Sequence, residues 1–304
     1  MRNLFALVAG ALLGAASPTF AFGPLEEPDA VVLGDNAVQI IDIRPSEAFE
    51  AGHIPGAVNA PYSVYRGPAE NPGQVPDVLD LQDALRAVGL NKEQPVLVVH
   101  AGDSETDFGA AAQVYWTLKT AGVPQLAVLN GGYEGWAADE GNEPDTGLST
   151  PEPSTVEIAY DDSWWIDAEG VAAVIDGRSD AVLIDARPGE FFRGETKHDA
   201  AGVAGTLQGA INFVHEAWFG GSPRIEPSED VIAQIRAVAD EHNGAPLVSF
   251  CNTGHWAATN WFAASELAGI EGVKLYPESM VGWTGEGRET VDGLINCADP
   301  SVAT

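Results

Sequence analysis

The sequence predicts an α/β protein built as two copies of one unit, each a parallel β-sheet flanked by helices. The first observation is an internal repeat: "IIDIRPSEAFEAGHIPGAVN" (40–59) is echoed by "LIDARPGEFFRG" (183–194) and "GTLQGAIN" (205–212). The second is that the strand candidate "QPVLVVHA" (94–101) is echoed by "APLVSFC" (245–251). Repetition of this length indicates one structural unit written twice.

Short apolar runs alternate with helical patterns within the first copy. The strand candidates "AVQIID" (37–42), "VLVVH" (96–100) and "LAVL" (126–129) have the continuous apolar character of buried parallel strands. The segments "VLDLQDALRAVG" (78–89) and "FGAAAQVYWTLKTAG" (108–122) carry apolar residues at three- and four-residue spacing and end in glycine, as helices do. This alternation gives a parallel sheet, with sites expected beyond the carboxyl ends of its strands.

The two copies are separated by a short segment of different composition. We place the N-terminal copy at 28–146 and the C-terminal copy at 156–296. Residues 147–155, "GLSTPEPST", are rich in Pro, Ser and Thr, which is typical of an extended linker.

The first 21 residues are interpreted as a secretory signal peptide. Arg2 supplies a positive charge, "LFALVAGALLGAA" is an apolar stretch too short to span a bilayer comfortably, and small residues suit cleavage after Ala21. An uncleaved anchor is the alternative. We expect the mature protein to be periplasmic, with no attachment to the membrane after cleavage.

The charge balance restricts the class of partner. The chain has 45 acidic and 14 basic side chains, for a net charge of −31. A field of this sign repels nucleic acid and anionic membranes, so we expect neither as a partner. An anionic substrate would have to be collected by a local cluster of positive groups.

One of the two cysteines lies where a parallel sheet places its sites. Cys251 follows the strand candidate "PLVSF", and the loop "CNTGHW" leads into a helix expected to begin near Ala257. Helix N-termini and nearby cations favour the reactive thiolate, and His255 would add charge if protonated. A buried cysteine packed as a small apolar residue is the alternative. Cys297, near the end of the chain, could be a packing residue, a free thiol or a disulfide partner of Cys251.

These motifs together resemble one family. The "D-x-R…G-H-I-P-G-A" pattern (Asp42, Arg44, 52–57), the duplicated layout and a cysteine opening a short loop in the second copy are similar to the tandem-domain rhodaneses, the thiosulfate and 3-mercaptopyruvate sulfurtransferases. The resemblance implies a rhodanese fold in each copy, a catalytic C-terminal copy and a non-catalytic N-terminal copy. In that alignment Ala101 stands at the position of Cys251.

The resemblance also implies a mechanism. Cys251 would take a sulfane sulfur from a small anionic donor, thiosulfate or 3-mercaptopyruvate, and hold it as a persulfide until cyanide or a thiol acceptor removes it. Arg187 and Arg193 are expected to bind the donor, and Asp185 to support the loop or the arginine. The active-site loop is expected to comprise Asn252, Thr253, Gly254, His255 and Trp256. We expect no cofactor, and no metal site, because Cys251 and His255 lack enough neighbouring ligands.

Other functions are weighed on the same residues. Related phosphatases of this topology have a longer loop that ends in arginine, and the loop after Cys251 has none. A non-enzymatic periplasmic sulfur carrier or thiol-dependent binding protein would use the same cysteine, and a pure scaffold would leave it buried and unused. "CNTGHW" matches neither the cationic loop of thiosulfate enzymes nor the loop of mercaptopyruvate enzymes, so the preferred donor stays open.

Overall fold

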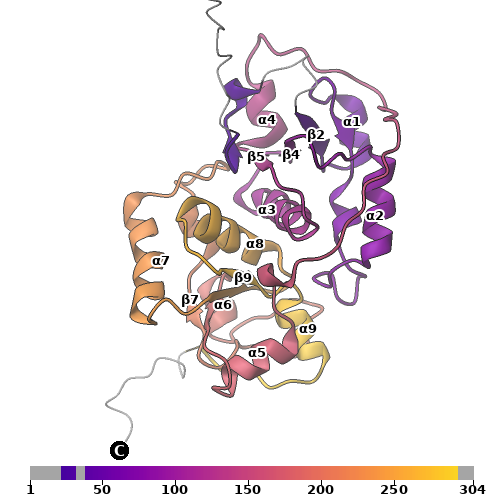
Figure 1. The fold of residues 1–304 in the computed structure, drawn as a ribbon. Coiled ribbons are helices and arrows are strands. Elements are labelled where there is room, and N and C mark those ends of the chain that lie inside the picture. Colours follow the sequence, from indigo (N-terminus) through magenta and orange to yellow (C-terminus); the bar gives the residue numbers. More distant parts are fainter. Residues whose placement is uncertain (1–21, 32–37, 294–304) are drawn as a thin grey trace, which may run out of the picture.

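The computed structural model describes residues 22–31 and 38–293, which form two parallel β-sheets with helices around them (Figure 1). This confirms the predicted fold class. The predicted signal peptide and Cys297 lie outside the described residues. No helix within those two ranges is both long and apolar enough to cross a membrane.

Each sheet pairs its strands in parallel and contains a central strand that is completely buried. The strand order is β1-β5-β4-β2-β3 in the N-terminal copy and β7-β6-β8-β9 in the C-terminal copy. The first sheet consists of β1 (Leu25–Glu26), β2 (Gln39–Asp42), β3 (Val58–Asn59), β4 (Val96–Val99) and β5 (Leu126–Leu129). The second consists of β6 (Val182–Asp185), β7 (Ile211–Asn212), β8 (Leu247–Phe250) and β9 (Lys274–Leu275). Burial of every residue in β4 and β8 explains their lack of polar alternation.

Helices connect the strands, and several begin at a residue whose side chain accepts a backbone N–H. Asp77, Ser104 and Ser228 cap α2, α3 and α7 in this way. The N-terminal copy contains α1 (Ser46–Ala51), α2 (Val78–Ala87), α3 (Glu105–Thr120) and α4 (Gly132–Ala137). The C-terminal copy contains α5 (Ala168–Ile175), α6 (Gly189–Phe192), α7 (Glu229–Glu241), α8 (His255–Phe262) and α9 (Ser279–Gly285). Single turns of 3-10 helix, η2 (Tyr62–Tyr65) and η4 (His215–Trp218), follow β3 and β7.

The two copies meet through α3 and α8, which lie side by side between the sheets (Figure 1). Aromatic rings interlock across this contact, with centroids 5.6 Å apart for Phe108 and Phe262 and 5.0 Å apart for Tyr115 and Phe262. Most of α3 is buried, including all residues from Phe108 to Leu118, which explains why its apolar residues are not confined to one stripe. The helix that follows Cys251 is therefore held directly against the N-terminal copy.

The segment between the copies runs along α2 (Figure 1). The Arg86 side chain donates to the carbonyl of Val156 at 2.9 Å, and the backbone N–H of Ile158 donates to the Gln82 side chain at 3.0 Å. The stretch predicted as a linker therefore continues into residues that are fixed to the N-terminal copy.

The strand pairings within each sheet show which residues of the two copies are equivalent. Asp42 pairs with Val99 in one sheet, and Asp185 pairs with Phe250 in the other. The next residues are thus His100 and Cys251, and the carbonyl of each accepts a backbone N–H, from Tyr133 and from Met280 respectively. The expectation that Ala101 occupies the position of Cys251 is wrong by one residue, because the equivalent residue is His100.

Candidate active site

Cys251 lies at the carboxyl end of β8, in the tight connection to α8. It carries a free thiol and is 1% exposed. Gly254 has φ of +80°, and a Cβ at this position would lie 2.5 Å from the carbonyl oxygen of Pro277, so a larger residue would be strained there and would clash. Helix α8 begins at His255 and not near Ala257, so His255 and Trp256 form its first turn and only residues 252–254 form a loop.

Ser279 holds the backbone of the cysteine from the neighbouring connection. Its hydroxyl accepts the backbone N–H of Cys251 at 2.9 Å and donates to the carbonyl of Tyr276 at 2.8 Å. Ser279 has φ of +52°, and Gly132, its counterpart in the N-terminal copy, has φ of +59°. A side chain in this conformation is strained, and in the C-terminal copy the strained residue is the serine whose hydroxyl bonds the backbone of Cys251.

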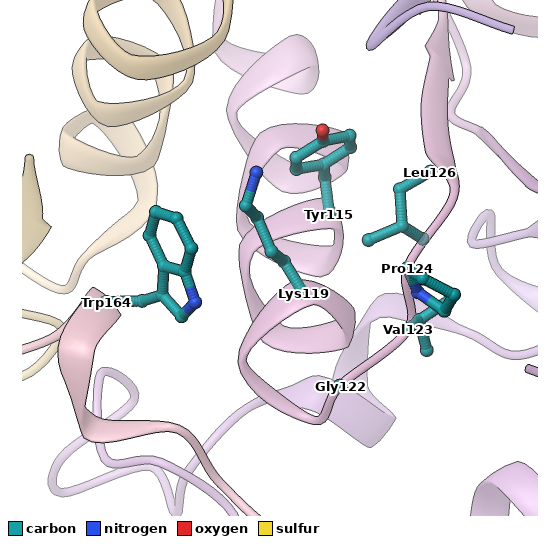
Figure 2. A pocket seen from close by; sticks show the side chains of 7 residues that line it. All are labelled: Tyr115, Lys119, Gly122, Val123, Pro124, Leu126 and Trp164. Carbon is teal, nitrogen blue, oxygen red and sulfur yellow. The ribbon is translucent and has the colours of Figure 1, made fainter. Parts of the chain in front are cut away.

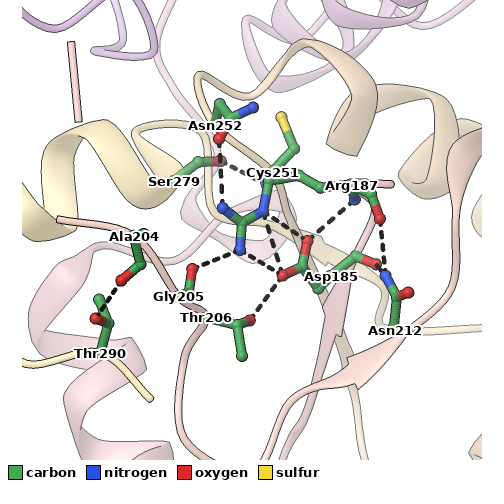
Figure 3. A network of polar contacts seen from close by, with 10 residues as sticks. All are labelled: Asp185, Arg187, Ala204, Gly205, Thr206, Asn212, Cys251, Asn252, Ser279 and Thr290. Carbon is green, nitrogen blue, oxygen red and sulfur yellow. Dashed lines mark hydrogen bonds and ion pairs between the residues drawn. The ribbon is translucent and has the colours of Figure 1, made fainter. Parts of the chain in front are cut away.

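Arg187 and Asp185 form a buried ion pair beneath the loop (Figure 3). The Arg187 side chain donates to both carboxylate oxygens of Asp185, at 2.7–3.2 Å, and to the carbonyl of Gly205 at 2.9 Å. Its remaining amino group lies 3.4 Å from the Asn252 side-chain oxygen. The expected supporting role of Asp185 fits this geometry, in which the pair connects the end of β6 to the residue after Cys251.

The two arginines expected to bind the donor are both paired with carboxylates. Figure 3 shows the Cys251 sulfur pointing away from the Arg187 guanidinium. Arg193, just after α6, is exposed and forms an ion pair with Glu195 at 2.8 Å, which raises the pKa of Arg193 further above its ordinary value. Donor binding by Arg187 and Arg193 stays a prediction.

His255 is held by two groups of the N-terminal copy. Its Nε2 lies 2.5 Å from the carbonyl of Thr106, and its Nδ1 lies 2.9 Å from the hydroxyl of Tyr62. A carbonyl only accepts, so Nε2 carries the proton. The Tyr62 hydroxyl at Nδ1 also donates to the side-chain oxygen of Gln113. Burial lowers the pKa of His255 to about 4. The charge that His255 would add if protonated is therefore absent until the pH falls well below the ordinary pKa of a histidine.

Trp256 and His215 form a second aromatic contact beside the loop. Their rings stack with centroids 4.7 Å apart and an interplanar angle of 11°. Burial lowers the pKa of His215 to about 4, against a weaker opposing effect of its hydrogen bond to the Ala186 carbonyl. The stack therefore contains a neutral imidazole and fixes the first turn of α8 from the side of the C-terminal copy.

Arg66 reaches the loop from the N-terminal copy, and the sequence did not predict this contact. Its guanidinium donates to the carbonyl of Thr253 at 2.9 Å and to the side-chain oxygen of Gln113 on α3. Arg66 and Thr253 lie far apart in the chain, and no local motif indicates that they are in contact.

Asn212 could have been predicted from the repeat as a residue that supports the site. "GAIN" repeats "GAVN", and each asparagine bonds the carbonyls of its Asp-x-Arg motif.

The corresponding connection of the N-terminal copy is closed by its own carboxylate. Asp107 accepts hydrogen bonds from His100 Nδ1 and from the backbone N–H of Gly102, both at 2.6 Å. Burial pushes the pKa of Asp107 up, but the interactions with His100 and the Gly102 N–H outweigh it, so the pKa lies below its ordinary value. An anion thus occupies the position where the C-terminal copy has its loop.

A separate pocket of about 240 Å³ is shown in Figure 2. The lining residues are Tyr115, Lys119, Gly122, Val123, Pro124, Leu126 and Trp164. Lys119 forms an ion pair with Glu266 at 2.9 Å and lies 4.6 Å from the Trp164 ring centroid, so its charge is already satisfied. No lining residue belongs to the Cys251 loop. Within the described ranges, no three His, Cys, Asp or Glu side chains gather in a way that could hold a metal ion.

Comparison with known proteins finds a matching family and several similar proteins. The family model for the rhodanese-like domain matches residues 31–139 and 167–286. A Pseudomonas aeruginosa protein named "Probable 3-mercaptopyruvate sulfurtransferase" is 29% identical over 276 residues, covering 88% of this chain and 93% of that protein. The thiosulfate sulfurtransferase of Azotobacter vinelandii is 26% identical over 245 residues, covering 80% and 87%.

A solved structure shows the same fold. The crystal structure of SseA, a 3-mercaptopyruvate sulfotransferase from Escherichia coli, superposes with a TM-score of 0.72 at 22% identity, covering 84% of this chain and 98% of that one. The family model covers well over half of the chain, once in each copy. The chain therefore belongs to the rhodanese-like domain family, with two such domains in tandem.

Proposed function

We propose that the protein is a sulfurtransferase that moves a sulfane sulfur from thiosulfate or 3-mercaptopyruvate to cyanide or a thiol through a persulfide on Cys251. The observation that carries this proposal is the position of a free thiol at the carboxyl end of β8, directly before the N-terminus of α8. Relatives named as thiosulfate and 3-mercaptopyruvate sulfurtransferases support the reaction class.

The reaction divides into two nucleophilic substitutions. The Cys251 thiolate forms a bond to the outer sulfur of thiosulfate, the sulfur–sulfur bond breaks, and sulfite leaves with the electron pair. With 3-mercaptopyruvate the carbon–sulfur bond breaks, and the carbon takes the pair and a proton to give pyruvate. Cyanide then bonds to the outer sulfur of the persulfide, thiocyanate leaves, and the thiolate returns.

The burial of Cys251 bears on the choice between enzyme, carrier and scaffold. Cys251 is 1% exposed, which is the burial that the scaffold alternative predicts, so sulfur transfer requires the covering residues to move before a donor can reach the thiol. A carrier that delivers sulfur to a dedicated protein would load once and stop with small acceptors.

We also propose export to the periplasm, which rests on the character of residues 1–21.

The test is turnover with small molecules. Purified protein is incubated with excess thiosulfate or 3-mercaptopyruvate and cyanide, and thiocyanate is measured against protein concentration. Many thiocyanates per chain support the enzyme. A single equivalent would support the carrier, and no thiocyanate or protein-bound sulfur from either donor would contradict both.

A further inference from the structure

Arg66 gives the catalytic loop a positive charge that the C-terminal copy does not supply. It follows η2, and its guanidinium lies 5.2 Å from the Tyr62 ring centroid. One amino group donates to the Thr253 carbonyl at 2.9 Å, and the other donates to the Gln113 side chain. Thr253 is two residues from Cys251, so this cation is attached to the loop that opens with the cysteine.

Arg66 differs from most arginines of the protein because no carboxylate is paired with it. Among arginines in residues 22–31 and 38–293, only Arg66 and Arg236 lack a carboxylate within ion-pair distance. Arg236 lies on α7, where it bonds the carbonyl of Ala268. Arg187 and Arg193 each have an acidic partner. The uncompensated arginine at the loop therefore comes from the non-catalytic copy.

We propose that Arg66 binds the anionic group of the sulfur donor, so that the N-terminal copy completes the donor site. This inference rests on the proposed function. A guanidinium has five N–H donors in a planar fork, of which two are used in the contacts described above. The sulfonate of thiosulfate and the carboxylate of 3-mercaptopyruvate are the acceptors that such a fork suits.

The overall charge makes such a contact necessary. With a net charge of −31, the protein repels a small anion at long range. Distant carboxylates are screened by salt within about 10 Å, whereas a half-buried cation in contact with the anion is screened much less. The same contact would stabilise the negative charge that develops on the leaving group as the donor's bond to sulfur breaks.

Two alkylating reagents test the charge preference without depending on sulfur transfer. Iodoacetate and iodoacetamide both react with a thiolate and release iodide, and they differ in charge. Cys297 is replaced by Ser so that Cys251 is the reacting thiol. We expect Arg66→Gln to lower the ratio of the iodoacetate rate to the iodoacetamide rate at least about tenfold, because it removes one close charge interaction.

Two further variants separate charge from loop support. Arg66→Lys keeps the charge and should keep the ratio within about threefold of the parent value. Arg178→Gln removes one exposed charge elsewhere, from the pair with Asp176, and should leave the ratio unchanged. Equal slowing of both reagents by Arg66→Gln, or the same low ratio for Arg66→Lys, would overturn the inference. Failure of both reagents to label Cys251 in the parent would instead contradict the proposed function.

Discussion

The two copies share one buried scaffold and differ at one strand end. Arg44 pairs with Asp42 in the N-terminal copy as Arg187 pairs with Asp185 in the C-terminal copy, through both carboxylate oxygens. Each arginine also bonds one carbonyl, that of Gly52 or of Gly205. Because the copy without a cysteine has the same ion pair, the Asp-x-Arg motif builds the fold and does not by itself mark a catalytic site.

The difference between the copies lies in the next connection. Where the C-terminal copy has Cys251, the N-terminal copy has His100, bonded to the carboxylate of Asp107. The helix begins four residues after Cys251 and five after His100. A small change in the connection therefore decides whether a thiol or an internal anion occupies this end of the sheet.

The largest expected effect comes from removing the thiol. Cys251→Ser should leave less than about a tenth of the sulfur-transfer turnover, because an alcohol cannot form the persulfide. The hydroxyl has nearly the same size, so the melting temperature should stay within about 4 °C of the wild type. Thiocyanate formation and thermal unfolding measure the two quantities. Turnover above that limit would mean that another group carries the sulfur.

The next effect compares the two ion pairs. Arg44→Met and Arg187→Met should each lower the free energy of unfolding by about 3–5 kcal/mol, because a buried carboxylate loses its partner. Only Arg187→Met should also reduce sulfur transfer per folded molecule, since Arg187 alone touches the residue after the cysteine. Urea unfolding and the two half-reactions are measured separately. Losses confined to the donor half-reaction would show that Arg187 contacts the donor and does more than hold the loop.

A smaller effect is expected on the pH dependence of the free energy of unfolding. His215 stands where the N-terminal copy has Tyr62, since their backbone N–H groups bond equivalent carbonyls. The folded pKa of His215 is about 4 against an ordinary 6.5, so the unfolded chain binds more protons between these values. The stabilisation is complete above pH 6.5 and is lost as the pH falls towards 4, by about 3 kcal/mol at the limit. His215→Gln should show a shallower loss of unfolding free energy between pH 7.5 and 4.5, and parallel curves would contradict the assignment.

The smallest effect is expected from placing a cysteine in the N-terminal copy. His100→Cys places a thiol at the position equivalent to Cys251, yet we expect no second persulfide after treatment with thiosulfate. The Asp107 carboxylate occupies the Gly102 N–H and would repel both the donor and a thiolate. Intact mass of the variant decides this. A second bound sulfur would show that strand position alone, without the loop, makes the site.

The sequence predicted the fold and the place of Cys251 at a strand end because both are local patterns. The repeat, the buried strands and the placement of Cys251 at a strand end depend on neighbouring residues. The predicted equivalence of Ala101 with Cys251 is wrong by one residue, although alignment of Pro95 with Pro246 already places His100 opposite Cys251. The start of α8 was missed because a left-handed glycine, Gly254, opens the helix without a side-chain cap.

The features that the sequence did not predict depend on contacts between the copies. Arg66 meets the Thr253 carbonyl only because α3 packs on α8. The low pKa of His255 has the same origin, since packing against Thr106 and Tyr62 partly desolvates the half-buried ring. Such effects follow from tertiary packing and leave no periodicity or motif to detect.

The most direct test of this account is the mass of the protein after donor treatment. The protein is incubated with thiosulfate or 3-mercaptopyruvate, freed of small molecules, and measured intact and as peptides. We predict a gain of one sulfur, about 32 Da, on the peptide that contains Cys251, and its loss on addition of cyanide. Sulfur found on any other residue, or no gain with either donor, would contradict the claim that the C-terminal copy carries the reaction.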